Sequence, residues 1–255
     1  MRRGTRIASL TRVPAARRLL AGLLAAGALA APAGAERGTS YDGSGAAWVR
    51  YTSRPAFDDS VAMTIEAWVY RRDAGRCETV VSHDFTASYW LGFCPGLRFY
   101  RSGRTWADAT AAVPAGRWTH VAASYDGATV RFYVDGEPAG SAPLGNDGAG
   151  VERPLVLGAD PSGMRLNFWG ALAEVRLWSV VRPPAAIRAE RFLDLRSAPG
   201  LVAVFGDGGA GEALTGDPGL AGRGTRAAGA QGARPLRVVA AVTGGDDPPE
   251  IRPRP

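Results

Sequence analysis

The amino-acid sequence predicts an all-β protein, a β-sandwich with one short helix. Past residue 36, apolar residues recur with a period of two in short runs, which is the pattern of strands that bury one face. Gly, Asp and Pro separate these runs, and 34 Gly and 18 Pro in 255 residues supply the turns that such a chain needs. With 46% hydrophobic and 21% charged residues, the composition is that of a globular protein with one sizeable core.

Several segments carry the strand pattern, in chain order. Apolar and polar residues alternate through 63–70, then through 120–125 and 130–134. Each of these runs predicts one strand with a side that faces the core. A further pair of strands is expected at 154–158 and 168–180.

Two Asp-Gly pairs predict tight hairpin turns, at 126–127 and at 135–136. Asp-Gly accepts the positive φ angles of two-residue turns, so three consecutive antiparallel strands are expected around these pairs. The one segment with a helical pattern is 183–192, whose prolines stand in the first turn, where a missing N–H costs little.

The first 35 residues predict a secretory signal peptide. Arginines lead into the apolar run 19–30, and Ala33, Gly34 and Ala35 supply the small-residue cleavage site. The apolar run is shorter than the roughly 20 residues that a membrane span requires. We therefore expect cleavage after Ala35, no stable membrane span in the mature protein, and a location that is secreted, periplasmic or in the cell envelope.

The charge of the chain argues against a nucleic-acid partner. Six of the 30 basic residues precede Ala35, where no acid occurs, so the mature chain carries 24 basic and 24 acidic residues. Binding to phosphate depends on an excess of clustered cations, which this balance lacks. All 30 basic residues are arginine, which indicates a GC-rich bacterial genome.

The two cysteines, Cys77 and Cys94, predict a disulfide in an exported protein. A hairpin centred midway between them would make them cross-strand neighbours within bonding reach. Such a bond contributes about 3 kcal/mol by the chain-entropy relation. The alternative is two buried free thiols. A metal pair is disfavoured, because neither His83 nor His120 stands at a recognised ligand spacing.

The mature chain is expected to form a single domain with a loose end. Residues 206–234 are rich in Gly and Ala with few apolar anchors, so they predict loop structure. Residues 235–242 are a candidate late strand beside the first ones. Residues 243–255 are expected to be a disordered tail.

Three segments, in the expected order, carry a family resemblance. They are MTIEAWVYRRD (63–73), GRWTHVAASYDGATVRFYVDGEPAGSA (116–142) and WGALAEVRLWSVVRPPAAI (169–187). This series resembles the laminin-G-like jelly-roll group of the concanavalin A-like lectin/glucanase superfamily. Segments 41–49 and 200–214 also resemble parts of the group, so the resemblance spans roughly 40–215.

The resemblance implies a two-sheet antiparallel jelly-roll β-sandwich, in which one curved sheet leaves a concave face. Members of the group are mostly non-catalytic adhesion or sugar-binding modules. Some hold calcium, and a minority branch consists of glucanases. Fold alone does not choose among these functions.

The glucanase signature is missing from the chain. Glucanases of this superfamily carry E-x-D-x-x-E, whose outer carboxylates act as nucleophile and acid/base of a retaining mechanism. None of the glutamates in the domain has an Asp two residues on, and no G-x-S-x-G, H-E-x-x-H or Gly-rich phosphate loop occurs. His120 is expected to be a packed or surface strand residue, and His83 a solvated turn residue. The sequence thus predicts a protein that is not an enzyme.

Calcium is a candidate cofactor, because several oxygen-bearing side chains stand in predicted loops. The family pattern G-x-I-D-E-V-R-I-W occurs at 170–178 with Ala173 in place of its Asp, which removes one oxygen ligand. The alternative is that these residues only form turns. The candidate ligands are Asp42, Asp84 and Asp160, with the loop residues Asn146 and Asp147.

Aromatic residues supply the candidates for ligand binding, because sugar-binding faces stack rings against the C–H faces of pyranosides. We expect Trp90, Tyr100, Trp106 and Arg98 to lie near one surface; the alternative for each ring is a place in the core. The predicted function is a secreted, non-catalytic module that binds a glycan or a cell-surface protein through the concave sheet or its loops. The alternatives are a divergent glycoside hydrolase or lyase, and a structural or adhesive cell-envelope component.

Overall fold

The structure is a computed structural model. It describes residues 39–43, 48–51, 53–58, 61–84, 88–101, 105–145, 153–160, 166–195, 197–205 and 252–253. The predicted signal peptide, the Gly-rich segment 206–234 and the candidate strand 235–242 lie outside these residues, as does most of the predicted tail.

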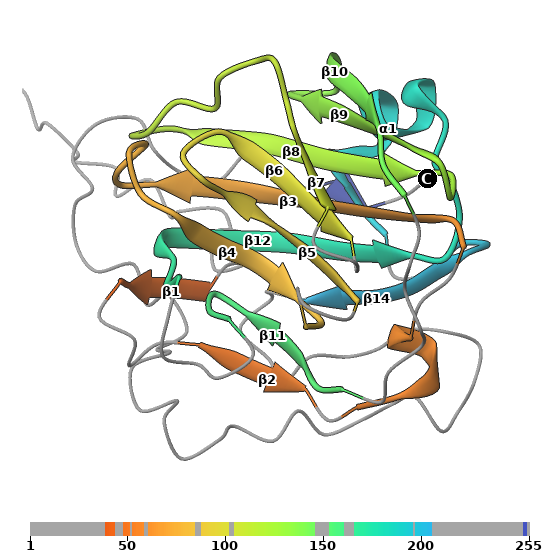
Figure 1. The fold of residues 1–255 in the computed structure, drawn as a ribbon, viewed down its shortest axis with the longest axis horizontal. Coiled ribbons are helices and arrows are strands. Elements are labelled where there is room, and N and C mark those ends of the chain that lie inside the picture. Colours follow the sequence, from red (N-terminus) through yellow and green to blue (C-terminus); the bar gives the residue numbers. More distant parts are fainter. Residues whose placement is uncertain are drawn as a thin grey trace, which may run out of the picture. The chain divides into compact units, whose positions relative to one another are not determined.

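The described strands form two antiparallel sheets that enclose a common core (Figure 1). The seven-stranded sheet, hereafter the first sheet, has the order β1-β12-β3-β8-β9-β10, with β14 paired to β12. Its strands are β1 (Thr39–Asp42), β3 (Met63–Arg71), β8 (Trp118–Tyr125), β9 (Thr129–Val134), β10 (Glu137–Pro143), β12 (Trp169–Trp178) and β14 (Leu201–Phe205).

The six-stranded sheet, hereafter the second sheet, has the order β2-β11-β4-β5-β6-β7. Its strands are β2 (Val49–Tyr51), β4 (Glu78–Ser82), β5 (Tyr89–Phe93), β6 (Leu97–Arg101), β7 (Thr105–Asp108) and β11 (Leu155–Leu157). The remaining described elements are the 3₁₀ turn η1 (Pro55–Phe57), helix α1 (Pro184–Glu190), and the two-residue strands β13 (Leu193–Asp194) and β15 (Arg252–Pro253), which pair in parallel.

The core lies between the two sheets, where the predicted alternation places it. Met63, Ile65, Ala67 and Val69 of β3 all belong to the main apolar cluster, together with residues from strands of the second sheet. The residues between them on β3 point to the other side of the first sheet. The all-β sandwich and the single short helix at 184–190 confirm the predicted fold class.

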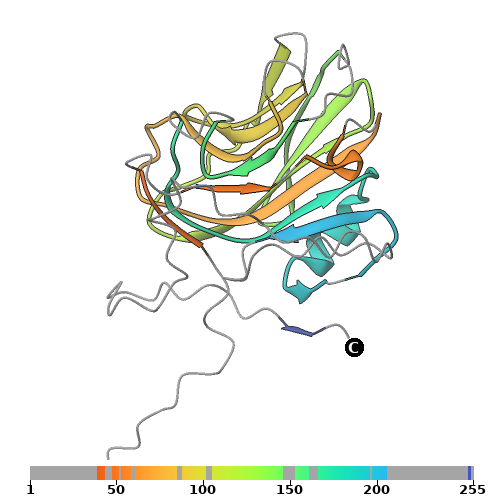
Figure 2. The same ribbon diagram turned by 90° about the horizontal axis from the view of Figure 1, so that it is seen from below.

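The outer face of the first sheet carries a second, smaller packing layer. Ile187 of α1 packs against Ala122 and Tyr133 of the sheet. Figure 2 shows α1 on the side of this sheet that faces away from the second sheet. Trp178 of β12 packs with Leu195 and with the neighbouring strand β14. The first sheet is therefore buried on both faces over part of its area.

The two Asp-Gly turns differ in length. Asp135 and Gly136 have φ angles of 52° and 81°, and Val134 pairs directly with Glu137, so this is the predicted two-residue turn. At the other site β8 ends at Tyr125 and β9 begins at Thr129, so three residues connect the strands. The Asp126 side chain accepts hydrogen bonds from the backbone N–H groups of Ala128 and Thr129. The prediction of a two-residue turn at 126–127 is wrong, because the Asp126 side chain stabilises a wider loop.

The two strands expected at 154–158 and 168–180 both form, as β11 and β12. They belong to different sheets, however: β11 pairs with β2 and β4, whereas β12 pairs with β1, β3 and β14. In the part of the chain that the structure describes, no helix is long and apolar enough to cross a membrane.

Candidate functional site

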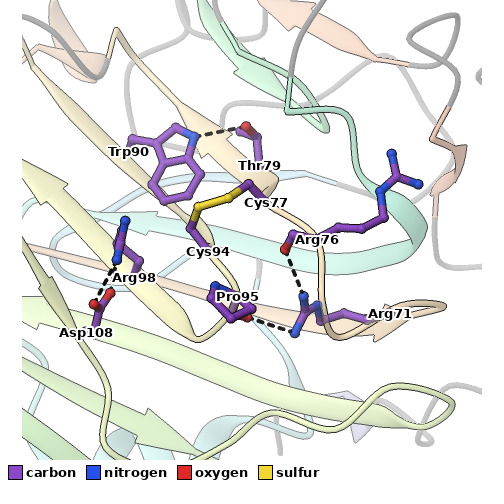
Figure 3. The surroundings of a disulfide bond; sticks show 9 residues. All are labelled: Arg71, Arg76, Cys77, Thr79, Trp90, Cys94, Pro95, Arg98 and Asp108. Atoms are coloured by element: carbon purple, nitrogen blue, oxygen red, sulfur yellow. Dashed lines mark hydrogen bonds and ion pairs between the residues drawn. A yellow bond between two sulfur atoms is a disulfide. The ribbon is translucent and has the colours of Figure 1, made fainter.

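The disulfide closes the β4–β5 hairpin at the predicted position. Cys77 and Cys94 are bonded, with Cα atoms 4.1 Å apart, and they flank the first cross-strand pair of the hairpin, Glu78 opposite Phe93 (Figure 3). The predicted cross-strand register is correct beside the disulfide, at Glu78 and Thr79. It shifts by one residue between Thr79 and Val81. No described cysteine is free.

Beside this hairpin, the outer face of β6 and β7 carries a group of aromatic and charged side chains, two of them exposed and two half-buried. Cross-strand pairing places Tyr100 opposite Trp106 and Arg98 opposite Asp108. The intervening residues of β6 and β7 point into the core. We call Arg98, Tyr100, Trp106 and Asp108 the aromatic platform.

The two rings of the aromatic platform lie nearly parallel. The centroids of Tyr100 and Trp106 are 5.9 Å apart, and their planes differ by 13°. Trp106 is 51% exposed, which is unusual for a tryptophan in a well-packed sandwich. The exposed part of the Trp106 indole offers apolar area to a ligand.

Arg98 is fixed in place beside these rings. Its Nε and one terminal nitrogen donate to the two carboxylate oxygens of Asp108 at 2.6 and 2.9 Å. Its guanidinium lies 5.1 Å from the centroid of the Trp106 ring. The hydrogen bond to Asp108 holds the pKa of Arg98 above its usual value. The pair presents donors and acceptors with no net charge.

Trp90 points to the same side of the second sheet as the aromatic platform, but it is not exposed. It pairs with Tyr100 across the β5–β6 ladder, but it is only 4% exposed, and its Nε1 donates to the hydroxyl of Thr79 at 2.9 Å. The expected exposure of Trp90 is wrong because Gly92 leaves room for the indole to lie along the sheet. A Cβ at Gly92 would stand 2.4 Å from the Trp90 ring. Figure 3 shows Trp90 beside the disulfide.

The candidate calcium ligands are not gathered by the fold. Asp84 follows β4 and Asp160 follows β11, and these strands run antiparallel, so the two residues lie at opposite ends of the pair. Asp84 is instead 3.4 Å from Nε of Arg153. Asp42 lies on β1 in the first sheet, opposite Trp169.

Among the described residues, no three His, Cys, Asp or Glu side chains are grouped so that they could hold a metal. Asn146 and Asp147 lie outside the described part of the chain.

His83 is buried, so the expectation of a solvated turn residue is wrong. Its Nδ1 lies 2.9 Å from the Ser88 hydroxyl, and its Nε2 lies 2.9 Å from the carbonyl oxygen of Arg153. The ring stacks on Tyr89 at a centroid distance of 5.0 Å. The start of β5 and the segment before β11 therefore enclose the imidazole, and each ring nitrogen has an oxygen within hydrogen-bond distance.

A buried ionic network lies under α1 and was not predicted from the sequence. Glu66 of β3 is fully buried, and its Oε1 accepts from Nε1 of Trp178 at 2.9 Å and from Arg182 at 2.8 Å. Arg176 lies 3.6 Å from the same oxygen, and Nε2 of His120 lies 3.6 Å from Oε2. One feature of the sequence could have indicated it: Glu66 stands in a predicted strand that is otherwise largely apolar.

The charge states of this network argue against acid catalysis by Glu66. Burial raises the pKa of Glu66, but the charges of Arg176 and Arg182 and the hydrogen bond from Trp178 outweigh it, and the net pKa is lowered. Burial lowers the pKa of His120 to about 4. A general acid needs a raised pKa and access to a substrate. Glu66 is instead an ionised carboxylate held among guanidinium groups.

Glu78 is the second buried carboxylate with a shifted pKa. Burial raises its pKa, while Nε of Arg71 donates to it at 3.0 Å and the backbone N–H of Trp169 donates to it at 3.1 Å. Arg71 also lies over the Phe93 ring, 3.8 Å from its centroid. Both carboxylates thus hold parts of the sandwich together.

The two antiparallel sheets and the order of their strands define a jelly-roll β-sandwich. The family model described as the concanavalin A-like lectin/glucanases superfamily matches residues 42–188, which is more than half of the chain. The chain belongs to this superfamily. The match confirms the resemblance inferred from the strand and turn motifs.

Solved structures share the fold at low sequence identity. A Bacteroides ovatus protein for which carbohydrate binding has been proposed has a TM-score of 0.58 and 20% identity, covering 71% of this chain and 56% of that one. This chain therefore spans little more than half of that protein. A comparison with curated protein sequences finds no match.

Two more distant structures are also similar. A SAP-like pentraxin from Limulus polyphemus has a TM-score of 0.47 and 13% identity, covering 60% of this chain and 81% of that one. Domains LG4-5 of the mouse laminin alpha1 chain have a TM-score of 0.44 and 17% identity, covering 56% and 41%.

Proposed function

We propose that this protein is a secreted, non-catalytic module that binds an extracellular glycan through the aromatic platform. The observation that carries the proposal is the exposed indole of Trp106, stacked in parallel with Tyr100 and flanked by the Arg98–Asp108 pair. Membership of a superfamily of lectins and glucanases supports the same class of ligand.

The chemistry of the platform suits a sugar without acidic groups. The C–H face of a pyranose packs on an indole or phenol ring, and burying that apolar area favours binding. Arg98 and Asp108 can donate to and accept from the sugar hydroxyls, because a guanidinium has five N–H donors and a carboxylate has several lone pairs. Since their charges cancel, the site gains little from an acidic sugar.

Two features support a binding role over hydrolysis. The paired carboxylates of the glucanase motif are missing from the sequence. The two buried glutamates with shifted pKa values, Glu66 and Glu78, are each engaged by arginine. Export by the predicted signal peptide would bring the module to its ligand.

A glycan array tests the proposal with three proteins: wild type, Trp106→Ala, and the control Val61→Ala, which removes an exposed apolar side chain that belongs to neither aromatic surface of the protein. Wild type and the control are expected to bind at least one neutral glycan, and Trp106→Ala is expected to lose about tenfold or more in affinity. Equal binding by Trp106→Ala and wild type contradicts the proposal.

A reducing-end assay on each bound glycan tests the non-catalytic part. No new reducing ends are expected on prolonged incubation. Release of fragments by the wild type would show a glycoside hydrolase. Capture of a cell-surface protein with no glycan signal would favour an adhesive module.

A further inference from the structure

The first sheet carries a second exposed aromatic surface, separate from the aromatic platform. It lies where the end of β3 pairs with the start of β12. Phe192 packs on Trp68 of β3, and the surface begins with the next residue on that face, Tyr70. It consists of Tyr70, Arg72, Arg76, Trp118 and Trp169, which we call the β12-end surface.

Trp169 is held in place by its backbone and by a glycine. Its N–H donates to Oε1 of Glu78 at 3.1 Å, and its carbonyl accepts from the N–H of Arg72 at 2.9 Å. Gly43 packs directly on it, because a Cβ at Gly43 would stand 2.9 Å from the Cβ of Trp169. Trp169 nevertheless stays 36% exposed. A fixed and exposed indole costs little conformational entropy when a ligand packs on it.

Two more rings share this face of the sheet. Tyr70 and Trp118 are a cross-strand pair, with ring centroids 5.9 Å apart. Tyr70 also pairs with Ala171, two residues after Trp169, so Tyr70 and Trp169 are diagonal neighbours, for which about 7–8 Å is usual. Ala171 between them is small. Both Tyr70 and Trp118 are half-buried, so ring edges remain available to a ligand.

The charge of the β12-end surface differs from that of the aromatic platform. The guanidinium of Arg76 lies 5.5 Å from the centroid of the Trp169 ring and donates to the Gly43 carbonyl. Arg72 is exposed beside Trp169 at the end of β3. Among the described residues, neither arginine forms an ion pair with a carboxylate, and Glu78 is bound by Arg71. The charge of Arg76 also stabilises the ionised form of Glu78, without a direct ion pair. The surface thus presents two arginines, neither in a direct ion pair among the described residues, next to aromatic rings.

We propose that the β12-end surface is a second binding site, for an acidic polysaccharide chain. Sugar rings pack on Trp169 and Tyr70, and a carboxylate or sulfate group of the chain is bound by Arg76 and Arg72. Guanidinium groups bind such oxyanions with paired hydrogen bonds. The site lies on the opposite sheet from the platform, so it does not depend on the function proposed above.

Affinity electrophoresis tests this site with polygalacturonate, dextran sulfate and uncharged dextran. The double variant Arg72→Gln/Arg76→Gln and the variant Trp169→Ala remove its two components. Trp106→Ala removes only the platform. The matched charge control is Arg188→Gln, which removes an exposed arginine that is paired with Glu137 on another part of the first sheet. Melting temperatures of all variants establish that they fold.

Wild type, Trp106→Ala and Arg188→Gln are expected to be retarded by polygalacturonate or dextran sulfate, and less so as salt rises. The double arginine variant and Trp169→Ala are expected to bind about tenfold more weakly or worse. Retardation by one polymer only identifies the acidic group as carboxylate or sulfate. Binding of neither polymer by the wild type at low salt, or binding unchanged in the double variant, overturns the proposal. Loss in Trp106→Ala alone would assign acidic glycans to the platform instead.

Discussion

Gly92 determines the position of Trp90, the buried tryptophan beside the aromatic platform. An alanine Cβ there would stand 2.2 Å from the Glu78 carbonyl oxygen and 2.4 Å from the Trp90 ring. Gly92→Ala is therefore expected to lower the free energy of unfolding by about 1–3 kcal/mol, the usual cost of overpacking. Urea unfolding measures it.

The matched control for this prediction is Gly96→Ala in the next turn, where an added Cβ would meet no atom within 4 Å. The control is expected to stay within about 0.5 kcal/mol of wild type. Equal stability of the two variants would contradict the packing described for Trp90.

His120 makes stability depend on pH. Its pKa is lowered to about 4 by burial, so the folded state binds its proton less readily than the unfolded state does. Stability is then complete above the ordinary histidine pKa of about 6.5 and falls as pH drops toward about 4. This group alone is expected to remove about 2 kcal/mol between pH 7 and pH 5.

The test is chemical denaturation of wild type and His120→Gln at several pH values in this range. The lowered pKa of Glu66 acts in the same direction at lower pH, because its carboxylate must also be protonated. The variant is expected to show a smaller loss of stability from pH 7 to 5. An unchanged pH slope would mean that His120 does not titrate as described.

At the scale of single residues, the sequence predicts which side of a sheet a side chain points to better than it predicts how exposed that side chain is. Period-two alternation identified the core positions of β3 correctly. The burial of Trp90 depends instead on Gly92, two residues further along β5, and on the Thr79 hydroxyl of the neighbouring strand. The burial of His83 depends on the backbone of Arg153. Thr79 and Arg153 are brought there by strand pairing, which alternation alone does not show. The ligand roles of Arg98, Tyr100 and Trp106 remain predictions.

The β4–β5 hairpin is the element that the disulfide stabilises. Cys77 and Cys94 are 17 residues apart, and a loop of this size gives about 3 kcal/mol in the chain-entropy relation. Reduction of wild type is expected to lower the free energy of unfolding by that amount, as measured by urea denaturation with and without reductant. Cys77→Ala/Cys94→Ala serves as control and should not respond to reductant. Two alkylatable thiols in the native oxidised protein would contradict the bond.

The sequence predicted the strands and the helix more completely than it predicted which strands pair with one another. The strands on both sides of the Asp135-Gly136 turn follow from local residue pattern, and so does α1. The assignment of β11 and β12 to different sheets does not, because it depends on contacts between distant segments. The width of the Asp126 turn depends on a side-chain hydrogen bond that competes with the two-residue geometry.

At the scale of the whole molecule, the layer under α1 was the least predictable feature. Glu66, Arg176 and Arg182 come from separate segments, and only the folded sandwich brings them together with His120. The network links Glu66 of β3 to the segment around α1. Because the charges of the first sheet's outer face are paired in this way, α1 can cover that face.

Export is also a prediction about the whole chain. Protein recovered after secretion by a bacterial host is expected to begin at Glu36, because the predicted cleavage follows Ala35. N-terminal sequencing measures this directly. A mature protein that begins at Met1 would contradict both the cleavage and the predicted location.

The most direct test of the proposed function is a crystal structure of the protein with the neutral glycan that it binds best. We predict a pyranose ring stacked on Trp106, with hydroxyl groups bonded to Arg98 or Asp108. A glycan bound elsewhere, with the aromatic platform empty, would contradict the account.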